Sequence, residues 1–385
     1  QARARQNKEL VLRLDESRNT EHLSVLPTRQ PADPFILDPQ KPGVAYLIPS
    51  SGTPGKPKRI PIYAAKLRAA YGNIPAVMTA DGGVKIKTKP ALITQPLVHI
   101  GGLFWVVHSL LDARPISLLD KFNVAQWAQA VEQYQIRVCS LVPAMINMVL
   151  ESDLPAEKIS SLICVRSGTA PLSVNAQQTF EQRFGIPILP TYGATEFSGA
   201  VCGWTLEAKK AFGDVKAGSV GRAYDGVGLR IADPESGEIL PMGETGILQV
   251  RSQQMANEHD WVSTTDLASI DADGFVWLSG RADAAINRGG FKIIPNEVAA
   301  ILEAHAQVKE ATVVAMDDAR LGQVPVAAVE LCEGASGVSE ASLKTWAKEN
   351  MTSYFVPVRF AIVDALPRTS SMKVSLMDVR RLFDS

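Results

Sequence analysis

Strand-like and helix-like segments alternate along residues 123–189, and this alternation limits the fold more than any other feature of the sequence. Short apolar runs at 138–142, 162–165 and 186–189 have the length of buried strands, and helical patterns lie between them. Strands that alternate with helices form a parallel sheet, whose ligands bind beyond the carboxyl ends of the strands. The pattern therefore predicts an α/β fold with a binding site at that edge.

Local signals define the helices predicted for this region. A second helix is expected after Pro143, since proline fits the first helical turn. A third is expected to start at Ser173 and to end at Gly185. The apolar residues of the first helix share one face and recur at helical spacing: Val124, Trp127, Ala128, Val131 and Tyr134.

Two further patterns follow the alternating region. Residues 215–251 alternate around glycine and proline turns, which predicts a small antiparallel β subdomain. Beyond residue 295 a compact unit is expected, with Asn296 capping a helix and Ser375 capping a final one.

We therefore expect two domains, 1–281 and 282–385. The first combines parallel α/β sheet layers with the antiparallel subdomain. The second is a small α+β unit.

Composition excludes some function classes. The formal net charge is -1 over 385 residues, so no electrostatic argument favours nucleic acid or an anionic membrane as a partner. No apolar run approaches membrane-spanning length, and the charged start is unlike a signal peptide. The four cysteines have no metal-type spacing and are expected to be buried thiols of a reducing compartment, which predicts a cytoplasmic location.

A strand at 44–48 runs into a loop that has the composition of a phosphate site. Backbone N–H groups, hydroxyls and ammonium ions of such a loop can all face one anion. It is not a Walker A loop, because Pro57 follows Gly-Lys, and an ordinary glycine-serine turn is the alternative. The candidate phosphate ligands are Ser50, Ser51, Gly52, Thr53, Gly55, Lys56 and Lys58.

Two loops follow predicted strands at the expected ligand edge. The first spans 166–171 and the second spans 191–196. Each taken alone is compatible with an ordinary strand-to-helix turn. The candidate residues in the two loops are Ser167, Gly168, Thr169, Ala170, Pro171, Tyr192, Gly193, Ala194, Thr195 and Glu196.

Residues 279–292 form a charged, glycine-punctuated turn between a strand-like and a helix-like segment. Gly289 and Gly290 give the backbone freedom that a side chain would remove. A surface hairpin is the plain interpretation. However, a Gly-Arg-x-Asp corner followed by Arg-Gly-Gly resembles the hinge of the adenylate-forming ligases, a group that contains acyl-CoA synthetases, peptide-synthetase adenylation domains and luciferases.

The resemblance runs from about residue 44 to residue 383. Tyr-Gly-x-Thr-Glu at 192–196 is among the more specific signatures of these ligases. A Pro-Leu-x-His-x-Gly-Gly stretch around His99 resembles the acyl-CoA synthetase version, and Leu-Pro-Arg-Thr at 366–369 with Lys373 resembles the C-terminal lysine loop.

The resemblance implies a reaction and a role for each motif. ATP and a small-molecule carboxylic acid would give an acyl-adenylate, and a thiol, coenzyme A, would then take the acyl group. The expected catalytic residues are Lys373, His99, Thr195 and Glu196, and Glu196 would also hold Mg²⁺.

The nucleotide and thiol sites are implied in the same way. Tyr192 would stack on adenine, and Asp266 with Arg281 would hold the ribose. Arg288, Gly289 and Gly290 would meet the thiol after the C-terminal lid has rotated.

The chain departs from the family pattern at Pro54, Thr265 and Met372, and the usual upstream segment is absent from this sequence. A fragment, or a partner that supplies this segment, would account for the absence. Two other functions stay open: a degenerate paralogue that binds nucleotide or a partner without efficient turnover, and a domain that loads a carrier protein.

Overall fold

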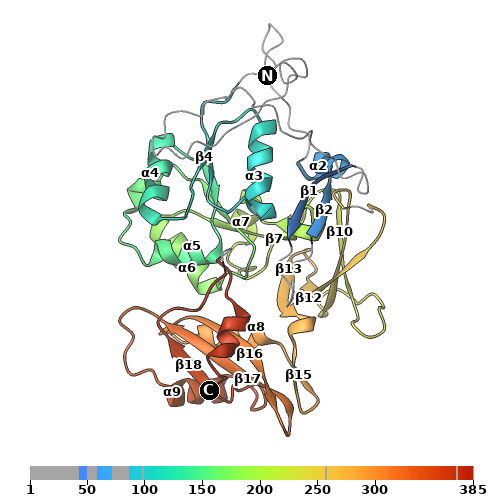
Figure 1. Cartoon of the computed structure of the whole chain (residues 1–385), viewed down its shortest axis with the longest axis vertical. Helices are drawn as coiled ribbons and strands as arrows, with labels where there is room; N and C mark the ends of the chain where they lie inside the picture. Colours follow the sequence, from blue (N-terminus) through green and yellow to red (C-terminus); the bar gives the residue numbers. More distant parts are fainter. Residues whose placement is uncertain are drawn as a thin grey trace, which may run out of the picture.

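The computed structural model describes residues 43–49, 59–71, 86–97, 99–255, 258–369 and 372–384. They form a large upper part and a smaller C-terminal unit, coloured orange to red in Figure 1. The α/β fold class predicted from the sequence is confirmed, with both parallel and antiparallel sheets.

The alternating region forms a sheet with the strand order β5-β6-β7-β8-β9. Its strands are β5 (Val138–Ser140), β6 (Cys164–Ser167), β7 (Ile188–Ala194), β8 (Gly199–Gly203) and β9 (Arg222–Ala223). The first three pair in parallel, as predicted, whereas β8 and β9 add antiparallel pairs. The helices of this region are α4 (Val124–Tyr134), α5 (Pro143–Leu150) and α6 (Val174–Phe184), with the 3-10 turn η1 (Ala156–Ile159) after α5.

The helix boundaries follow the local signals of the sequence. Pro143 is the first residue of α5. The Ser173 hydroxyl accepts the Ala176 N–H and caps α6, and Gly185 ends that helix in the left-handed conformation. Trp127 and Val131 of α4 are fully buried in the core of this region. These predictions are confirmed.

One part of the ligand edge differs from the prediction. Residues 191–194 were expected in a loop, but β7 continues through them to Ala194. After its parallel pairing with β6 ends, β7 pairs antiparallel with β8, where Tyr192 lies opposite Cys202. Thr195 and Glu196 then form the 3-10 turn η2 (Thr195–Phe197).

Smaller elements cover the upper part. β1 (Val44–Pro49) pairs antiparallel with β2 (Arg59–Tyr63), and α2 (Ala64–Tyr71) follows. β3 (Ala91–Ile93) pairs in parallel with β4 (Ile116–Leu118) across the apolar helix α3 (Ile100–Leu111). A short helix, α7 (Leu206–Phe212), links β8 to β9.

The predicted antiparallel subdomain is present and is larger than expected. Its sheet has the order β10-β11-β12-β13. The strands are β10 (Val227–Ala232), β11 (Gly246–Ser252), β12 (Val262–Ile270) and β13 (Val276–Arg281). The segment that enters the hinge is therefore the last strand of this sheet.

The C-terminal unit begins with the 3-10 turn η3 (Ala282–Ala284). Its strands are β14 (Ile286–Arg288), β15 (Phe291–Ile293), β16 (Val308–Asp318), β17 (Gly322–Leu331) and β18 (Phe360–Val363). Its helices are α8 (Pro295–Glu303), α9 (Glu340–Asn350) and α10 (Leu376–Arg381). The domain boundary at residues 281 and 282 stays a prediction.

Of the two caps predicted for this unit, the one at Ser375 is correct, and Ser339 is a further cap. Ser339 and Ser375 each accept an N–H from the first turn of the following helix. The prediction for Asn296 is wrong, because Pro295 is the first helical residue and Ile294 occupies the cap. Proline has the φ of a helix start and lacks an N–H that would need a partner, so its position decides the boundary.

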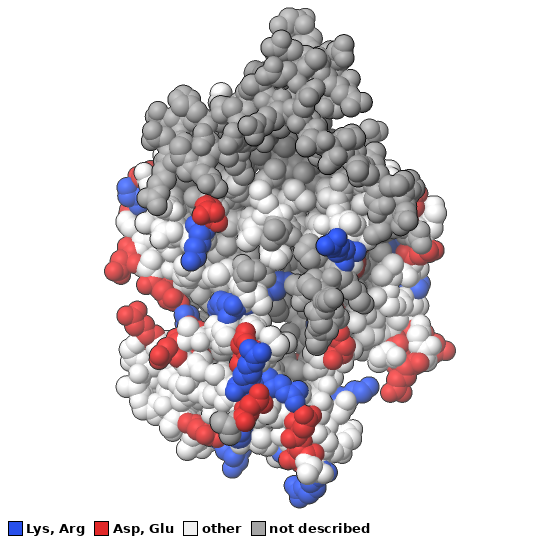
Figure 2. Space-filling model, viewed as in Figure 1, with Lys and Arg blue, Asp and Glu red and all other residues white. Residues whose placement is uncertain are grey.

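Charge and cysteine placement agree in part with the sequence. Positive and negative side chains are interspersed on the face shown in Figure 2. Cys139, Cys164 and Cys202 are buried and free, whereas Cys332 is half-buried, contrary to the expectation of four buried thiols. None of the helices in the described ranges is long and apolar enough to span a bilayer.

Candidate active site

The hinge stretch has the glycine-dependent geometry predicted for it. β14 and β15 form a hairpin whose turn consists of Gly289 and Gly290, with φ of 57° and 92°. Both values lie in the left-handed region that glycine adopts at little cost. At the start of the hinge, the Arg281 guanidinium binds Asp283 through Nε and Nη2, at 2.8 and 2.6 Å.

Tyr192 and Asp266, predicted to hold the adenine and the ribose, are in direct contact. The Tyr192 hydroxyl donates a 2.5 Å hydrogen bond to Oδ2 of Asp266. Burial and the neighbouring Asp266 carboxylate raise the pKa of Tyr192, which keeps the phenol protonated as a donor. Arg281 lies opposite Asp266 in the pairing of β12 with β13. The structure therefore brings the three expected nucleotide residues together.

The loop at 167–171 lies against β7. Thr191 donates from Oγ1 to the Ser167 carbonyl at 3.2 Å. A Cβ on Gly168 would lie 2.7 Å from that same Oγ1, so only glycine fits there. Thr169 adopts a left-handed φ of 73°, and Ala170 and Pro171 follow toward the surface. The Ser167 hydroxyl is buried and has no hydrogen-bond partner within the described ranges.

Gly193 shows a second close approach, to the backbone of β8. A Cβ at this position would lie 2.2 Å from the Gly199 carbonyl oxygen. Ala194 ends β7, and Thr195 is half-buried at the start of η2. Glu196 follows with an exposed side chain. The glycine thus lets the Tyr-Gly-x-Thr-Glu stretch turn at the sheet edge.

Lys373 reaches this group from the C-terminal unit. Its carbonyl accepts the Thr369 N–H at 2.8 Å, which closes a turn between Arg368 and Val374. Burial and the nearby Arg281 lower the pKa of Lys373, and Glu196 opposes them. The ammonium group of Lys373 therefore lies within electrostatic reach of both Glu196 and Arg281.

His99 completes the group from the upper part of the molecule. It precedes α3 as the cap residue, and its side chain makes no capping hydrogen bond. The Nε2 atom is buried, and no described residue bonds to it. Burial and, secondarily, Lys373 lower the pKa of His99, which favours a neutral imidazole. A buried unpaired ring nitrogen can accept or donate a hydrogen bond to a substrate.

Arg288, Gly289 and Gly290 lie in a separate place. The Arg288 guanidinium donates to the carbonyls of Tyr354 and Val356, at 2.6 and 3.3 Å. Those contacts are all within the C-terminal unit. Arg288 and Gly289 border a hollow of about 260 Å³. In this hollow the ring of Phe291, a residue that is 54% exposed, stacks on the ring of Tyr354 with their centroids 4.5 Å apart. Sequence reasoning missed this aromatic pair; the only signal was an aromatic residue directly after Gly-Gly.

The predicted phosphate ligands, residues 50–58 with Pro54, lie outside the described residues. The metal prediction can be placed in part. Within the described ranges no group of three or more His, Cys, Asp or Glu residues could hold a metal ion. The Glu196 carboxylate can serve as one protein ligand of Mg²⁺, an ion that keeps water and phosphate oxygens as its other ligands.

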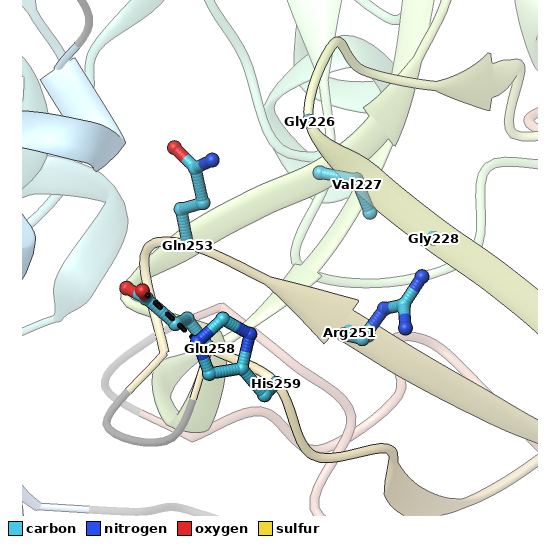
Figure 3. Close-up of a pocket in the computed structure, with 7 residues that line it drawn as sticks. All are labelled: Gly226, Val227, Gly228, Arg251, Gln253, Glu258 and His259. Atoms are coloured by element: carbon cyan, nitrogen blue, oxygen red, sulfur yellow. Dashed lines mark ion pairs between the residues drawn. The ribbon is translucent and has the colours of Figure 1, made fainter.

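A larger hollow, of about 370 Å³, lies away from these residues (Figure 3). It is bordered by the start of β10, the end of β11 and the Glu258–His259 pair, whose ionisable atoms are 3.5 Å apart. None of the predicted site residues lines it.

Comparison with known proteins decides the family. The profile of AMP-binding enzymes matches residues 1–258, and the profile of their C-terminal domain matches residues 297–373. The chain belongs to the AMP-binding enzyme family. This confirms the resemblance to adenylate-forming ligases that the sequence motifs indicated.

Relatives in this family are named as ligases of coenzyme A. The 2-succinylbenzoate–CoA ligase of Bacillus pumilus is 30% identical over 86% of the chain and 67% of the relative. The 4-coumarate–CoA ligase-like 9 of Arabidopsis thaliana is 27% identical over 91% of the chain and 64% of the relative. The chain therefore spans about two thirds of the length of these relatives.

Solved structures of the family share the fold. The o-succinylbenzoate CoA synthetase of Bacillus subtilis, in complex with its acyl-adenylate intermediate, gives a TM-score of 0.70 at 27% identity, over 88% of this chain and 69% of that protein. ATP-bound MatB from Rhodopseudomonas palustris gives a TM-score of 0.76 at 24% identity, over 89% of this chain and 68% of that protein.

Proposed function

We propose that the protein activates a carboxylic acid with ATP to an acyl-adenylate and then transfers the acyl group to coenzyme A. The observation that carries this proposal is the Tyr192–Asp266 contact, with Lys373 of the C-terminal unit close enough to Glu196 and His99 of the upper part for their charges to interact. Charge of both signs thus converges where a nucleotide phosphate and a carboxylate would react.

Nucleotide binding would use contacts that are already formed. Asp266 presents a carboxylate whose second oxygen can accept a ribose hydroxyl while Tyr192 holds the first. Arg281 is fixed by Asp283 next to this carboxylate and can donate to the same diol. Thr195 would bind a phosphate oxygen through its hydroxyl. The Tyr192 ring would lie against the adenine.

In the first half-reaction an oxygen of the acid attacks the α-phosphorus of ATP, and the bond to pyrophosphate breaks. Lys373 would stabilise the negative charge shared between the carboxylate and the α-phosphate. The neutral His99 side chain, whose Nε2 has no hydrogen-bond partner among the described residues, would orient the acyl group or the phosphate groups of the substrates. Mg²⁺, held through Glu196, would neutralise phosphate charge when bound. Protein residues act by position and charge, without a covalent intermediate.

In the second half-reaction the sulfur of the thiol forms a bond to the acyl carbon, and AMP leaves. Lys373 has no role in this step, whereas the Gly289-Gly290 turn would lie beside the thiol once the C-terminal unit has rotated near Asp283. In the present arrangement the Gly289 N–H of that turn donates to the Leu321 carbonyl, within the C-terminal unit. The proposal therefore requires two orientations of the lid.

The acid is proposed as a class only. Relatives are named for 4-coumarate, 2-succinylbenzoate and oxalate. These names favour a panel of aromatic acids and dicarboxylic acids, beside fatty and amino acids. The pocket between about residues 99 and 201 would select among them.

Exchange between ATP and pyrophosphate, measured for each acid, tests the proposal. We expect exchange that depends on one acid class and on Mg²⁺, followed by thioester formation when coenzyme A is added. Nucleotide binding without exchange for any acid would instead support a degenerate paralogue. Transfer only to a carrier protein would support the loading function.

A further inference from the structure

The turn that presents Lys373 contains a residue in an unfavourable conformation. Met372 has a left-handed φ of 64°, and its N–H donates to the Thr369 carbonyl at 2.9 Å. A residue with a Cβ is strained in this region, whereas glycine is not. The turn forms with methionine at this position, so another contact must offset the strain.

The Met372 side chain supplies a contact that glycine cannot make. It packs against the buried cluster of the upper part, which is built around Trp127, Ile146 and Phe180. Every other described member of that cluster comes from residues 92–188. In Figure 1 the red segment of the C-terminal unit extends upward to the level of α5 and α6. Methionine is flexible and apolar, and so suits an irregular gap at such a junction.

A second contact links the two parts beside this turn. The Lys309 ammonium binds both Glu151, at the end of α5, and Glu330, within β17. Burial disfavours the charge on Lys309, but the two carboxylates outweigh it and raise the pKa of this lysine. The other oxygen of Glu330 accepts the Leu366 N–H at 2.8 Å, just before the turn. The ion pair therefore fixes the base of the same turn.

Arg368 connects the base of the turn to its tip. Its guanidinium binds Glu310 at 2.5 Å and donates to the Met372 carbonyl at 3.2 Å. The turn is thus held from inside its own unit by Arg368, and against the upper part by Met372 and by the Lys309–Glu151 pair.

We propose that Met372 is a positioning residue for Lys373: its side chain docks in the upper part's core and holds the lid in the orientation that forms the acyl-adenylate. The proposal rests on the two half-reactions proposed above. In this proposal Met372 favours the first half-reaction over the second, because the docked side chain must leave its site before the lid can rotate.

Tryptic cleavage after Arg368 and Lys373, followed by mass spectrometry on the substrate-free protein, tests docking without any activity. We expect Met372→Ala and Met372→Gly to be cleaved about tenfold faster than the natural chain, since each removes a packed side chain. Met372→Leu should restore protection. On the other side of the junction, Glu151→Gln at a partly exposed side chain should speed cleavage about twofold, because it weakens the ion pair with Lys309.

Rates of the two half-reactions test the positioning role. Met372→Gly and Met372→Ala should both form acyl-adenylate about tenfold more slowly, and both should convert supplied acyl-adenylate to thioester at least as fast as the natural chain. If strain rather than docking governed the turn, Met372→Gly would form acyl-adenylate faster than the natural chain, and the proposal would be wrong. Equal cleavage of the natural, Ala and Gly chains would also overturn it. That result stands even if no acid substrate is found.

Discussion

The Tyr192 hydroxyl donates to the Asp266 carboxylate across 2.5 Å and thereby joins the mixed sheet of the upper part to the antiparallel subdomain. Asp266 faces Arg281, the last residue of β13. The proposed nucleotide site and the proposed pivot of the lid are therefore neighbours in one strand pair.

Replacing Asp266 should weaken AMP binding more than replacing its partner. Asp266→Ala removes the acceptor proposed for the ribose. It should raise the Kd for AMP about tenfold or more, because a hydrogen bond to a charged group contributes that much to affinity. Tyr192→Phe keeps the ring and frees the carboxylate, so its Kd should change by less than about threefold. Calorimetric titration measures both, with exposed Asp225→Ala as the control. Unchanged affinity in Asp266→Ala would place the ribose elsewhere.

Glu196 should matter for the metal rather than for the nucleotide. Glu196→Ala should lower Mg²⁺-dependent acyl-adenylate formation about tenfold or more, because it removes the protein ligand proposed for the metal. AMP binding without Mg²⁺ should stay close to that of the natural chain. The exposed Glu207→Ala serves as a matched control. An equal loss in both assays would mean that Glu196 has a structural role.

Local sequence signals predicted much of the fold, since they depend on neighbouring residues. The caps at Ser173 and Ser375 and the glycine turn at residues 289–290 are of this kind. The prediction that Asn296 caps a helix was wrong because Pro295, directly before it, is a stronger signal for a helix start.

Contacts between distant residues could not be predicted in the same way. β7 extends through Tyr192 because β8 pairs with it, and no local pattern reports that pairing. The docking of Met372 and the Lys309–Glu151 pair join residues more than 150 positions apart.

Lys373 should give the first half-reaction an alkaline limit. Burial and Arg281 lower the pKa of Lys373 below its ordinary 10.5, and the ammonium form is the one that stabilises charge. The kcat/KM for acyl-adenylate formation, which reports groups of the free enzyme, should therefore fall as pH rises through this lowered pKa. In Lys373→Arg any residual activity should not show this alkaline decrease, because arginine stays charged. An alkaline decrease that persists in Lys373→Arg would come from the titration of another group.

Glu303 should make stability decrease with pH. Burial at the end of α8 raises the pKa of Glu303 from 4.5 to about 7, so folding takes up a proton between these values. The free energy of unfolding is then highest below this window and declines as pH rises through it. Glu303→Gln keeps an acceptor for the Ala311 N–H. As pH rises from 5 to 8, the free energy of unfolding of Glu303→Gln in urea should therefore increase by on the order of 2 kcal/mol relative to that of the natural chain. A constant difference across that range would contradict the assignment.

The most direct test of the two-orientation account is to measure both half-reactions of Lys373→Ala, with exposed Lys348→Ala as the control. Pyrophosphate exchange should fall on the order of 10²–10³-fold, the usual effect of removing one preorganised charge donor. Thioester formation from supplied acyl-adenylate should stay within about threefold of the natural rate. Equal slowing of both half-reactions would contradict a lid that brings Lys373 to only one of them.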